Sequence, residues 1–181
     1  MAQPATLFRF RISLSDIDRG VYESLDLRIA KHPSEIDHFL ISRVLAYSLN
    51  YDRALEFPPG GLSDPDQPAL KMMNDRGQIG LWIEIGNPSP KKLHKASKAA
   101  SLVKVYTYKD ASLLLKEMAA EKVHKAEQIE IYSFAPKFLD QLSSWLERDN
   151  SWNVVSQEGS LSVSSDKGSL ETELTRRTAQ A

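Results

Sequence analysis

The strand predicted at residues 78–86 carries a carboxylate in an unusual setting. Its residues alternate between an aliphatic face (Ile79, Leu81, Ile83 and Ile85) and a face made of Gly80, Trp82, Glu84 and Gly86. A carboxylate such as that of Glu84 suits a hard cation such as Mg²⁺, which prefers oxygen ligands. Trp82 shares the same face and is a candidate stacking platform for an unpaired base. The ordinary alternatives are a surface acid and a tryptophan that packs in the core or at its rim.

Two further acids and a group of lysines also stand out in the sequence. Glu35 lies at the start of a predicted helix, and Asp66 lies in a turn-rich segment. Both have ordinary explanations, because acids are favoured near helix N-termini and aspartate is a common turn former. Residues 91–109 contain six lysines and no acid, which is also typical of a solvated helix face.

Several other kinds of site are excluded by residue type and spacing. His32, Glu35 and His38 do not form a zinc motif, because Pro33 places His32 outside the helix and the order differs from His-Glu-x-x-His. The chain has no Gly-x-Ser-x-Gly elbow and no Gly-x-x-x-x-Gly-Lys-Ser/Thr loop. It has no cysteine, which excludes disulfides, thiolate metal sites and a cysteine nucleophile.

Length and composition predict one globular domain over residues 1–181. Apolar residues make up 41% and charged residues 26%, which is ordinary globular usage. The N-terminus lacks a basic start followed by an apolar run, and no segment reaches the ~20 apolar residues of a membrane helix, so we expect a cytoplasmic protein. The formal net charge of −1 disfavours a broad, non-specific coat of nucleic acid.

Hydrophobic periodicity predicts a mixed α/β fold. Strands are predicted at residues 6–14 and 25–29 as an N-terminal hairpin, at 69–73 and 78–86 as a second hairpin, at 102–108, at 128–134, and at 152–174 with breaks at 158–159 and 166–168. Helices are predicted at 35–51, at 90–101 after a Ser89 cap, after an Asp110 cap, and at 136–147. Alternating strands and helices between hairpins predict a mixed sheet with helices on both faces. The polar tail 175–181 is expected to fray.

Six short stretches, taken together and in order, resemble the bacterial YaeQ family. They are Asp16-Ile17-Asp18-Arg19, Lys31-His32-Pro33-Ser34-Glu35, Arg43-Val44-Leu45-Ala46-Tyr47, Gly61-Leu62-Ser63, Asp66-Gln67-Pro68-Ala69-Leu70, and Leu81-Trp82-Ile83-Glu84-Ile85-Gly86-Asn87-Pro88, followed by a C-terminal hairpin with Ser165-Asp166-Lys167-Gly168. The resemblance implies a restriction-endonuclease-like core, the fold of the PD-(D/E)xK nucleases. Because unrelated functions share folds, activity is a separate question.

The resemblance also implies a set of catalytic, metal-binding acids: Glu35 on the first core helix, Asp66 in the Pro-Asp element, and Glu84 on the hairpin strand. In such a site Mg²⁺ or Mn²⁺ activates water and neutralises charge. The expected lysine two residues after Glu84 is replaced by Gly86. The helix that follows could supply the lysine instead, with Lys92 slightly ahead of Lys95. Further departures from the family pattern occur at Gly60, Gln67 and Ile36.

Two hypotheses follow from these residues. The first is a nuclease-like protein that binds a divalent metal at the three acids and a nucleic acid at Lys91, Lys92 and Lys95, with Trp82 as a further contact. The second is a catalytically inactive nuclease-fold domain that serves as a protein-interaction or transcription-related regulatory module. The loss of the motif lysine at Gly86 motivates the second hypothesis.

Overall fold

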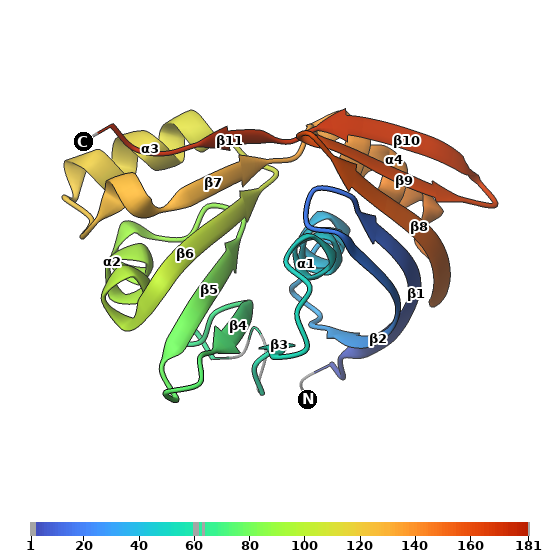
Figure 1. Cartoon of the computed structure of the whole chain (residues 1–181), viewed down its shortest axis with the longest axis horizontal. Coiled ribbons are helices and arrows are strands. Elements are labelled where there is room, and N and C mark those ends of the chain that lie inside the picture. The colour runs from blue at the N-terminus through green and yellow to red at the C-terminus, as the bar shows by residue number, and fades with distance from the viewer. Residues whose placement is uncertain (1–2, 60–61, 63, 181) are drawn as a thin grey trace. The chain divides into compact units, whose positions relative to one another are not determined.

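The computed structural model of the chain describes residues 3–59, 62 and 64–180 (Figure 1). The chain divides into two compact units. Unit 1 contains Met1–Leu49 and Phe134–Leu174, and unit 2 contains Asn50–Ser133 and Thr175–Ala181. The single domain expected from chain length stays a prediction.

Unit 1 is built on a five-stranded sheet with the order β10-β9-β8-β1-β2. Its strands are β1 (Thr6–Asp16), β2 (Val21–Lys31), β8 (Asp149–Gln157), β9 (Ser160–Ser165) and β10 (Gly168–Glu173). The hairpin β1–β2 is antiparallel from Thr6↔Lys31 to Asp16↔Val21, whereas β8 runs parallel to β1. Both hairpins predicted from alternation, β1–β2 and β9–β10, are present.

Alternation along β1 decides which side of this sheet becomes the core. Phe10, Ile12 and Leu14 are at most 2% exposed, and Arg9 and Arg11 occupy the opposite face. The apolar face packs against α1 (Asp37–Leu49) and α4 (Pro136–Trp145), which also contact each other. Phe10 meets Trp152 of β8 edge to face, with the ring centroids 5.2 Å apart.

Unit 2 is built on a six-stranded mixed sheet with the order β11-β7-β6-β5-β4-β3. Its strands are β3 (Leu55–Glu56), β4 (Leu70–Met73), β5 (Ile79–Ile85), β6 (Ala100–Thr107), β7 (Glu130–Ser133) and β11 (Thr175–Arg177). The predicted hairpin β4–β5 is antiparallel, whereas β5, β6 and β7 run parallel and are connected by helical segments.

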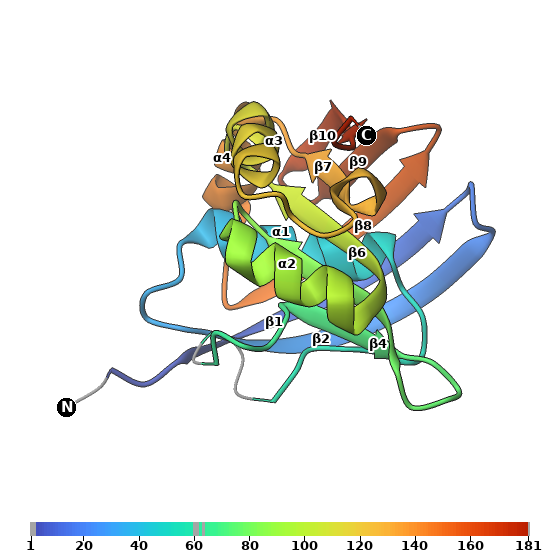
Figure 2. The same cartoon turned by 90° about the vertical axis from the view of Figure 1, so that its left-hand side faces the viewer.

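Two capped helices cover one face of this second sheet. They are α2 (Pro90–Ala99) and α3 (Ala111–Ala120), and α2 lies across β6 in the view of Figure 2. Ser89 caps α2 by accepting a hydrogen bond from the Lys92 N–H, and Asp110 caps α3 by accepting one from the Ser112 N–H. Both caps were predicted from sequence. The helices and strands enclose an apolar core that includes Leu93, Val105 and Leu114.

The mixed α/β fold is confirmed, with three differences in detail. The strands form two sheets, although the sequence predicted one. Helix α1 begins at Asp37 because the Glu35 side chain bonds back to the His32 N–H and closes a turn before the helix. In the segment expected to fray, Thr175–Arg177 pairs with β7, and Arg176 binds Glu130 at 3.1 Å.

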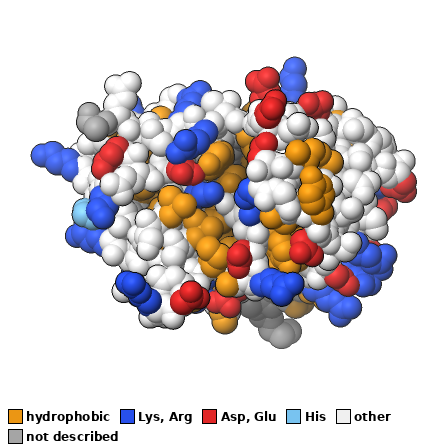
Figure 3. Space-filling view, in the orientation of Figure 1, with side chains coloured by type: hydrophobic (Ala, Val, Ile, Leu, Met, Phe, Trp, Pro, Cys, Tyr) orange, Lys and Arg blue, Asp and Glu red, His pale blue; other side chains and the backbone are white. Residues whose placement is uncertain are grey.

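The surface carries charges of both signs. On the face drawn in Figure 3 acidic and basic side chains are interspersed, in keeping with the formal net charge of −1. Among the described residues, no helix combines the length and the apolar character needed to cross a membrane.

Candidate functional site

Glu84 is a buried carboxylate on β5. It is 4% exposed, and Trp82, two residues earlier on the same strand face, is 3% exposed. The indole Nε1 of Trp82 donates a hydrogen bond to Glu84 Oε1 at 2.7 Å. Strand alternation therefore places the two side chains together, as the sequence indicated, but under the helices and away from the surface.

Helix α2 supplies a cation to this carboxylate. Lys92 Nζ lies 3.2 Å from Glu84 Oε1, with the lysine side chain 26% exposed. Burial raises the pKa of Glu84 above its usual range, and the attraction of Lys92 and the bond from Trp82 oppose that shift only in part. The site therefore holds a carboxylate whose charge is costly unless a cation stays beside it.

Asp66 binds the next lysine along the same helix. Lys95 Nζ donates to Asp66 Oδ1 at 2.8 Å, and both side chains are open to solvent. The hydrogen bond from Lys95, followed by its charge, lowers the pKa of Asp66. The backbone N–H of Asp66 donates to Asp64 Oδ1 at 2.9 Å, which fixes the turn that carries it.

The helix α2 thus connects the two acids of unit 2. Lys92 and Lys95 are three residues apart, so their side chains leave the same face of α2 on neighbouring turns. One lysine reaches the buried Glu84 and the other reaches the exposed Asp66. This relationship follows from the Ser89 cap, because the first turn of α2 fixes the direction in which both lysines project.

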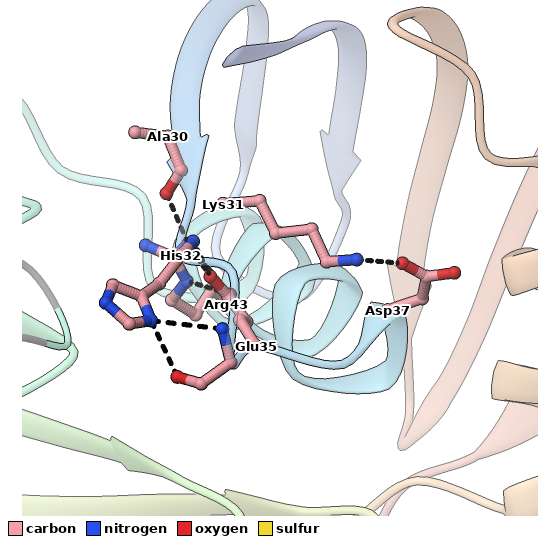
Figure 4. A network of polar contacts seen from close by, with 7 residues as sticks. Ala30, Lys31, His32, Glu35, Asp37 and Arg43 are labelled. Atoms are coloured by element: carbon pink, nitrogen blue, oxygen red, sulfur yellow. Dashed lines mark hydrogen bonds and ion pairs between the residues drawn. The ribbon is translucent and has the colours of Figure 1, made fainter. Parts of the chain in front are cut away.

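Glu35 belongs to unit 1 and has a different environment (Figure 4). It is 5% exposed, and the Arg43 guanidinium donates to both carboxylate oxygens at 2.9 Å. The His32 N–H donates to Oε2 at 3.0 Å. Burial raises the pKa of Glu35, and Arg43 acts against that shift. A two-pronged, buried pair of this kind anchors the segment before α1 to the helix.

Comparison with known proteins agrees with this architecture. The family model described as "YaeQ protein" matches residues 1–174. The chain belongs to the YaeQ family. It is similar to the protein of Escherichia coli (strain K12) that bears the name "Uncharacterized protein YaeQ", at 30% identity over 176 residues, or 97% of each chain.

Two solved structures of YaeQ proteins have the same fold. The protein from Pseudomonas syringae superimposes with a TM-score of 0.89 at 32% identity, over 99% of both chains. The protein from Xanthomonas axonopodis pv. citri superimposes with a TM-score of 0.87 at 30% identity, over 97% of this chain and 99% of that one. The likeness extends over both units, so the two sheets belong to the family fold.

The backbone explains why a lysine is absent two residues after Glu84 in this YaeQ-family chain. Gly86 has a φ of 78°, a conformation that side-chain-bearing residues rarely adopt. Its N–H bonds to the Tyr106 carbonyl at 2.8 Å, which ties the end of β5 to β6. The lysine beside Glu84 comes from α2 instead. Lys92 is the lysine that lies beside Glu84, and its role in completing the site stays a prediction.

The remaining predicted residues lie at different depths. Lys91 is exposed and lines an open groove of about 550 Å³ with Glu117 of α3 and Glu121, the residue after this helix. Trp82 packs in the core of unit 2, so its ring faces are covered here. Of the departures from the family pattern, Ile36 is 53% exposed and Gln67 is half-buried. Gly60, and with it Gly61 and Ser63, lie outside the described residues.

Sequence analysis assigned no role to Arg43, the partner of Glu35. A signal was present, because Arg43 lies within the apolar face of α1 between Leu40 and Val44. A charged residue in such a position is buried on folding and therefore needs a counter-charge. In the part of the chain that the structure describes, no three His, Asp or Glu side chains are grouped as a metal site.

Proposed function

We propose that this YaeQ-family protein is nuclease-like and that unit 2 binds a divalent cation and a nucleic-acid phosphate beside α2. The observation that supports it most is the pairing of two carboxylates with successive lysines of one helix, Lys92 with Glu84 at 3.2 Å and Lys95 with Asp66 at 2.8 Å. Assignment of Glu84 and Asp66 to a PD-(D/E)xK site is part of this proposal, and the role of Glu35 in unit 1 stays a prediction from the family resemblance.

The donor set suits Mg²⁺ or Mn²⁺, which prefer carboxylate oxygens. Among the described residues, both contacts to the Glu84 carboxylate fall on Oε1, so Oε2 is the oxygen offered to a cation. The side chain of Asp66 is 74% exposed, so a cation can reach its carboxylate. When bound, such a cation would activate a water molecule and neutralise charge on a phosphate.

The lysines have a separate task in this proposal. In the free protein each lysine forms an ion pair with a carboxylate, and this attraction keeps the ammonium group beside the acid. When a cation takes the carboxylates, the lysines are released toward a bound phosphate. Lys91, exposed at the start of α2, adds a third positive charge on the same helix. Trp82 contributes by holding Glu84 in place rather than by stacking on a base.

Calorimetric titration with Mn²⁺ tests the proposal without a guess at the substrate. We expect saturable binding to the wild type that is lost in Glu84→Gln, a variant that keeps an oxygen for Trp82. The matched control is Glu56→Gln, which removes an exposed carboxylate ion-paired with a lysine at 3.6 Å in the same unit. Absence of saturable binding to the wild type, or equal binding to Glu84→Gln, would contradict a metal site at Glu84.

The competing proposal is a catalytically inactive domain that acts through protein contacts. It is favoured by the internal neutralisation of all three acids, by Arg43, Lys92 and Lys95. Under this proposal Glu84→Gln and Asp66→Asn leave the biological activity unchanged. A strain carrying each variant in place of the native gene separates the two proposals, because the nuclease-like function requires both carboxylates.

A further inference from the structure

The strand β2 forms one edge of the sheet of unit 1, as Figure 1 shows. It is 11 residues long and pairs with β1 over its whole length. Within the described residues no other strand pairs with it. A long unpaired edge is a template for another strand unless its side chains oppose pairing.

The backbone direction of β2 shows which residues could pair. The Ala30 carbonyl accepts a hydrogen bond from Arg43 Nη2 at 3.1 Å, so it faces away from β1. Because backbone groups alternate in direction along a strand, the even-numbered residues from Tyr22 to Ala30 present their N–H and C=O groups to the outer edge. A second strand can bond to these N–H and C=O groups from Tyr22 to Arg28 and to the Ala30 N–H, because Arg43 already occupies the Ala30 carbonyl.

The charges of β2 are self-complementary in one two-fold register. When two antiparallel copies meet about Leu27, Asp26 of each lies opposite Arg28 of the other, and Glu23 lies opposite Lys31. Leu25 then faces Ile29 and Leu27 faces Leu27 on the apolar side. Two neighbouring registers also bring the outward-facing backbone groups of the two strands together. One of them places Asp26 opposite Asp26, and the other places Arg28 opposite Arg28. Like charges directly opposite destabilise a strand pair, so they oppose these registers.

Existing contacts agree with this register. Arg9 of β1 donates to both oxygens of Asp26, at 2.9 and 2.7 Å. Addition of Arg28 from a second copy extends this pair into a ladder of alternating charge across three strands. Neither Glu23 nor Arg28 is ion-paired with another residue that the structure describes. Lys31 is ion-paired with Asp37 at 2.6 Å, so Glu23 of a second copy would join that pair.

The exposed apolar side chains of this face support the same register. Tyr22 is 63% exposed and Leu7 is 56% exposed. Leu7 lies beside Ala30 on the neighbouring strand. In the two-fold pair Tyr22 of one copy is the diagonal neighbour of Ala30 of the other, a spacing that aromatic side chains bridge. Two apolar side chains that are solvated in one copy therefore gain cover in the pair.

We propose that the protein forms a two-fold dimer through antiparallel pairing of β2 with β2 of a second copy, which joins two five-stranded sheets into one. The dimer is independent of the proposed metal site, because it uses unit 1 only. Its interface is isologous, so each contact between Asp26 and Arg28 occurs twice.

A charge exchange tests the register by sedimentation velocity over a wide range of protein concentration. We expect the wild type to dimerise, and Arg28→Glu and Asp26→Lys each to weaken the dimer by about tenfold or more, since each places two like-charge pairs opposite one another. A mixture of the two variants restores both attractive pairs and should recover the heterodimer. The control Arg53→Glu makes the same charge change on an exposed loop of unit 2.

Cross-linking gives a second, independent measurement. The chain has no cysteine, so the double variant Ser24→Cys with Ala30→Cys contains only the two introduced thiols. These positions are opposite one another only between two copies, and cross-strand neighbours have the spacing of a disulfide. Oxidation should yield a covalent dimer. A wild type that stays monomeric at all concentrations, a dimer that tolerates both charge variants, or no disulfide in the double variant overturns the proposal.

Discussion

Trp82 Nε1 and Glu84 Oε1 are joined by a 2.7 Å hydrogen bond between neighbouring side chains on one face of β5. Both residues are buried, and a buried polar group requires a partner. Trp82 fixes the orientation of the carboxylate and Lys92 balances its charge. The candidate site is therefore held in position before any ligand arrives.

The charge on Glu84 should lower stability at neutral pH. Burial raises the pKa of Glu84 in the folded chain above the ordinary 4.5, which applies to the unfolded chain. Between the unfolded and the folded pKa, the folded chain holds the Glu84 proton more tightly than the unfolded chain does. The stabilisation that comes from protonation of Glu84 in the folded chain is fully present below the unfolded pKa and is lost as pH rises through the folded pKa. In urea unfolding, the stability of Glu84→Gln relative to wild type should therefore increase as the pH rises from acid to neutral.

Glu56→Gln is the control for this pH series, because it removes an exposed carboxylate from the same unit. A stability difference between wild type and Glu84→Gln that does not change with pH would contradict the assignment. A difference that changes in the opposite direction would show that Lys92 and Trp82 outweigh the cost of burial.

Gly86 should resist substitution more than Gly80, although both lie in the same segment. A Cβ at Gly86 would come no closer than 3.8 Å to Tyr108, an ordinary contact, so the cost arises from its φ of 78°. We expect Gly86→Ala to lose about 1–2 kcal/mol. Gly80→Ala, whose Cβ would lie 3.6 Å from its nearest neighbours, should stay within about 0.5 kcal/mol of wild type. Chemical unfolding measures both, and equal losses would contradict the argument.

Local sequence features predicted most of the elements. The alternation in β1 and β5, the Ser89 and Asp110 caps and the glycine-containing turns act over a few residues, so they can be read directly. The division into two sheets depends on pairing such as Arg9↔Asp149, which joins segments far apart in the chain. Periodicity shows that a strand has an apolar face, but it does not identify the strand beside it.

The candidate site was predictable in part. Alternation placed Trp82 beside Glu84, and the position of α2 after β5 suggested Lys92 as the cation. The burial of Glu84 was not predicted, because alternation gives the face of a side chain but not what covers that face. Burial there depends on how α2 and α3 cover the sheet. The pairing of Glu35 with Arg43 was missed. Helix periodicity shows which face of α1 carries Arg43, but it does not give the distance from Arg43 to Glu35 in the turn before the helix.

Removal of Arg43 should destabilise unit 1 strongly. Arg43→Met leaves the Glu35 carboxylate buried without its guanidinium, and breaking a buried pair from one side costs about 3–5 kcal/mol. The double variant Glu35→Gln with Arg43→Met removes both charges and should recover most of this loss. Denaturant unfolding of the four proteins gives the coupling energy. Strictly additive losses would contradict a direct interaction.

The salt dependence of nucleic-acid binding tests the role of Lys95. Each phosphate contact made by a lysine adds about 0.7–0.9 to the magnitude of the slope of log K against log salt concentration. Lys95→Gln should reduce the slope by about that amount and weaken binding similarly for all sequences. Fluorescence anisotropy with labelled single-stranded and duplex oligonucleotides, with and without Mn²⁺, measures this.

Lys116→Gln, on the exposed side of α3, is the matched control and should leave the slope unchanged. Asp66→Asn separates the lysine from its acid, since it frees Lys95 and removes a negative charge. Without metal it should tighten binding, and with Mn²⁺ it should lose any enhancement that the cation provides. Equal slopes for wild type and Lys95→Gln would mean that Lys95 serves only the ion pair with Asp66. Absence of nucleic-acid binding by the wild type would contradict the nuclease-like proposal itself.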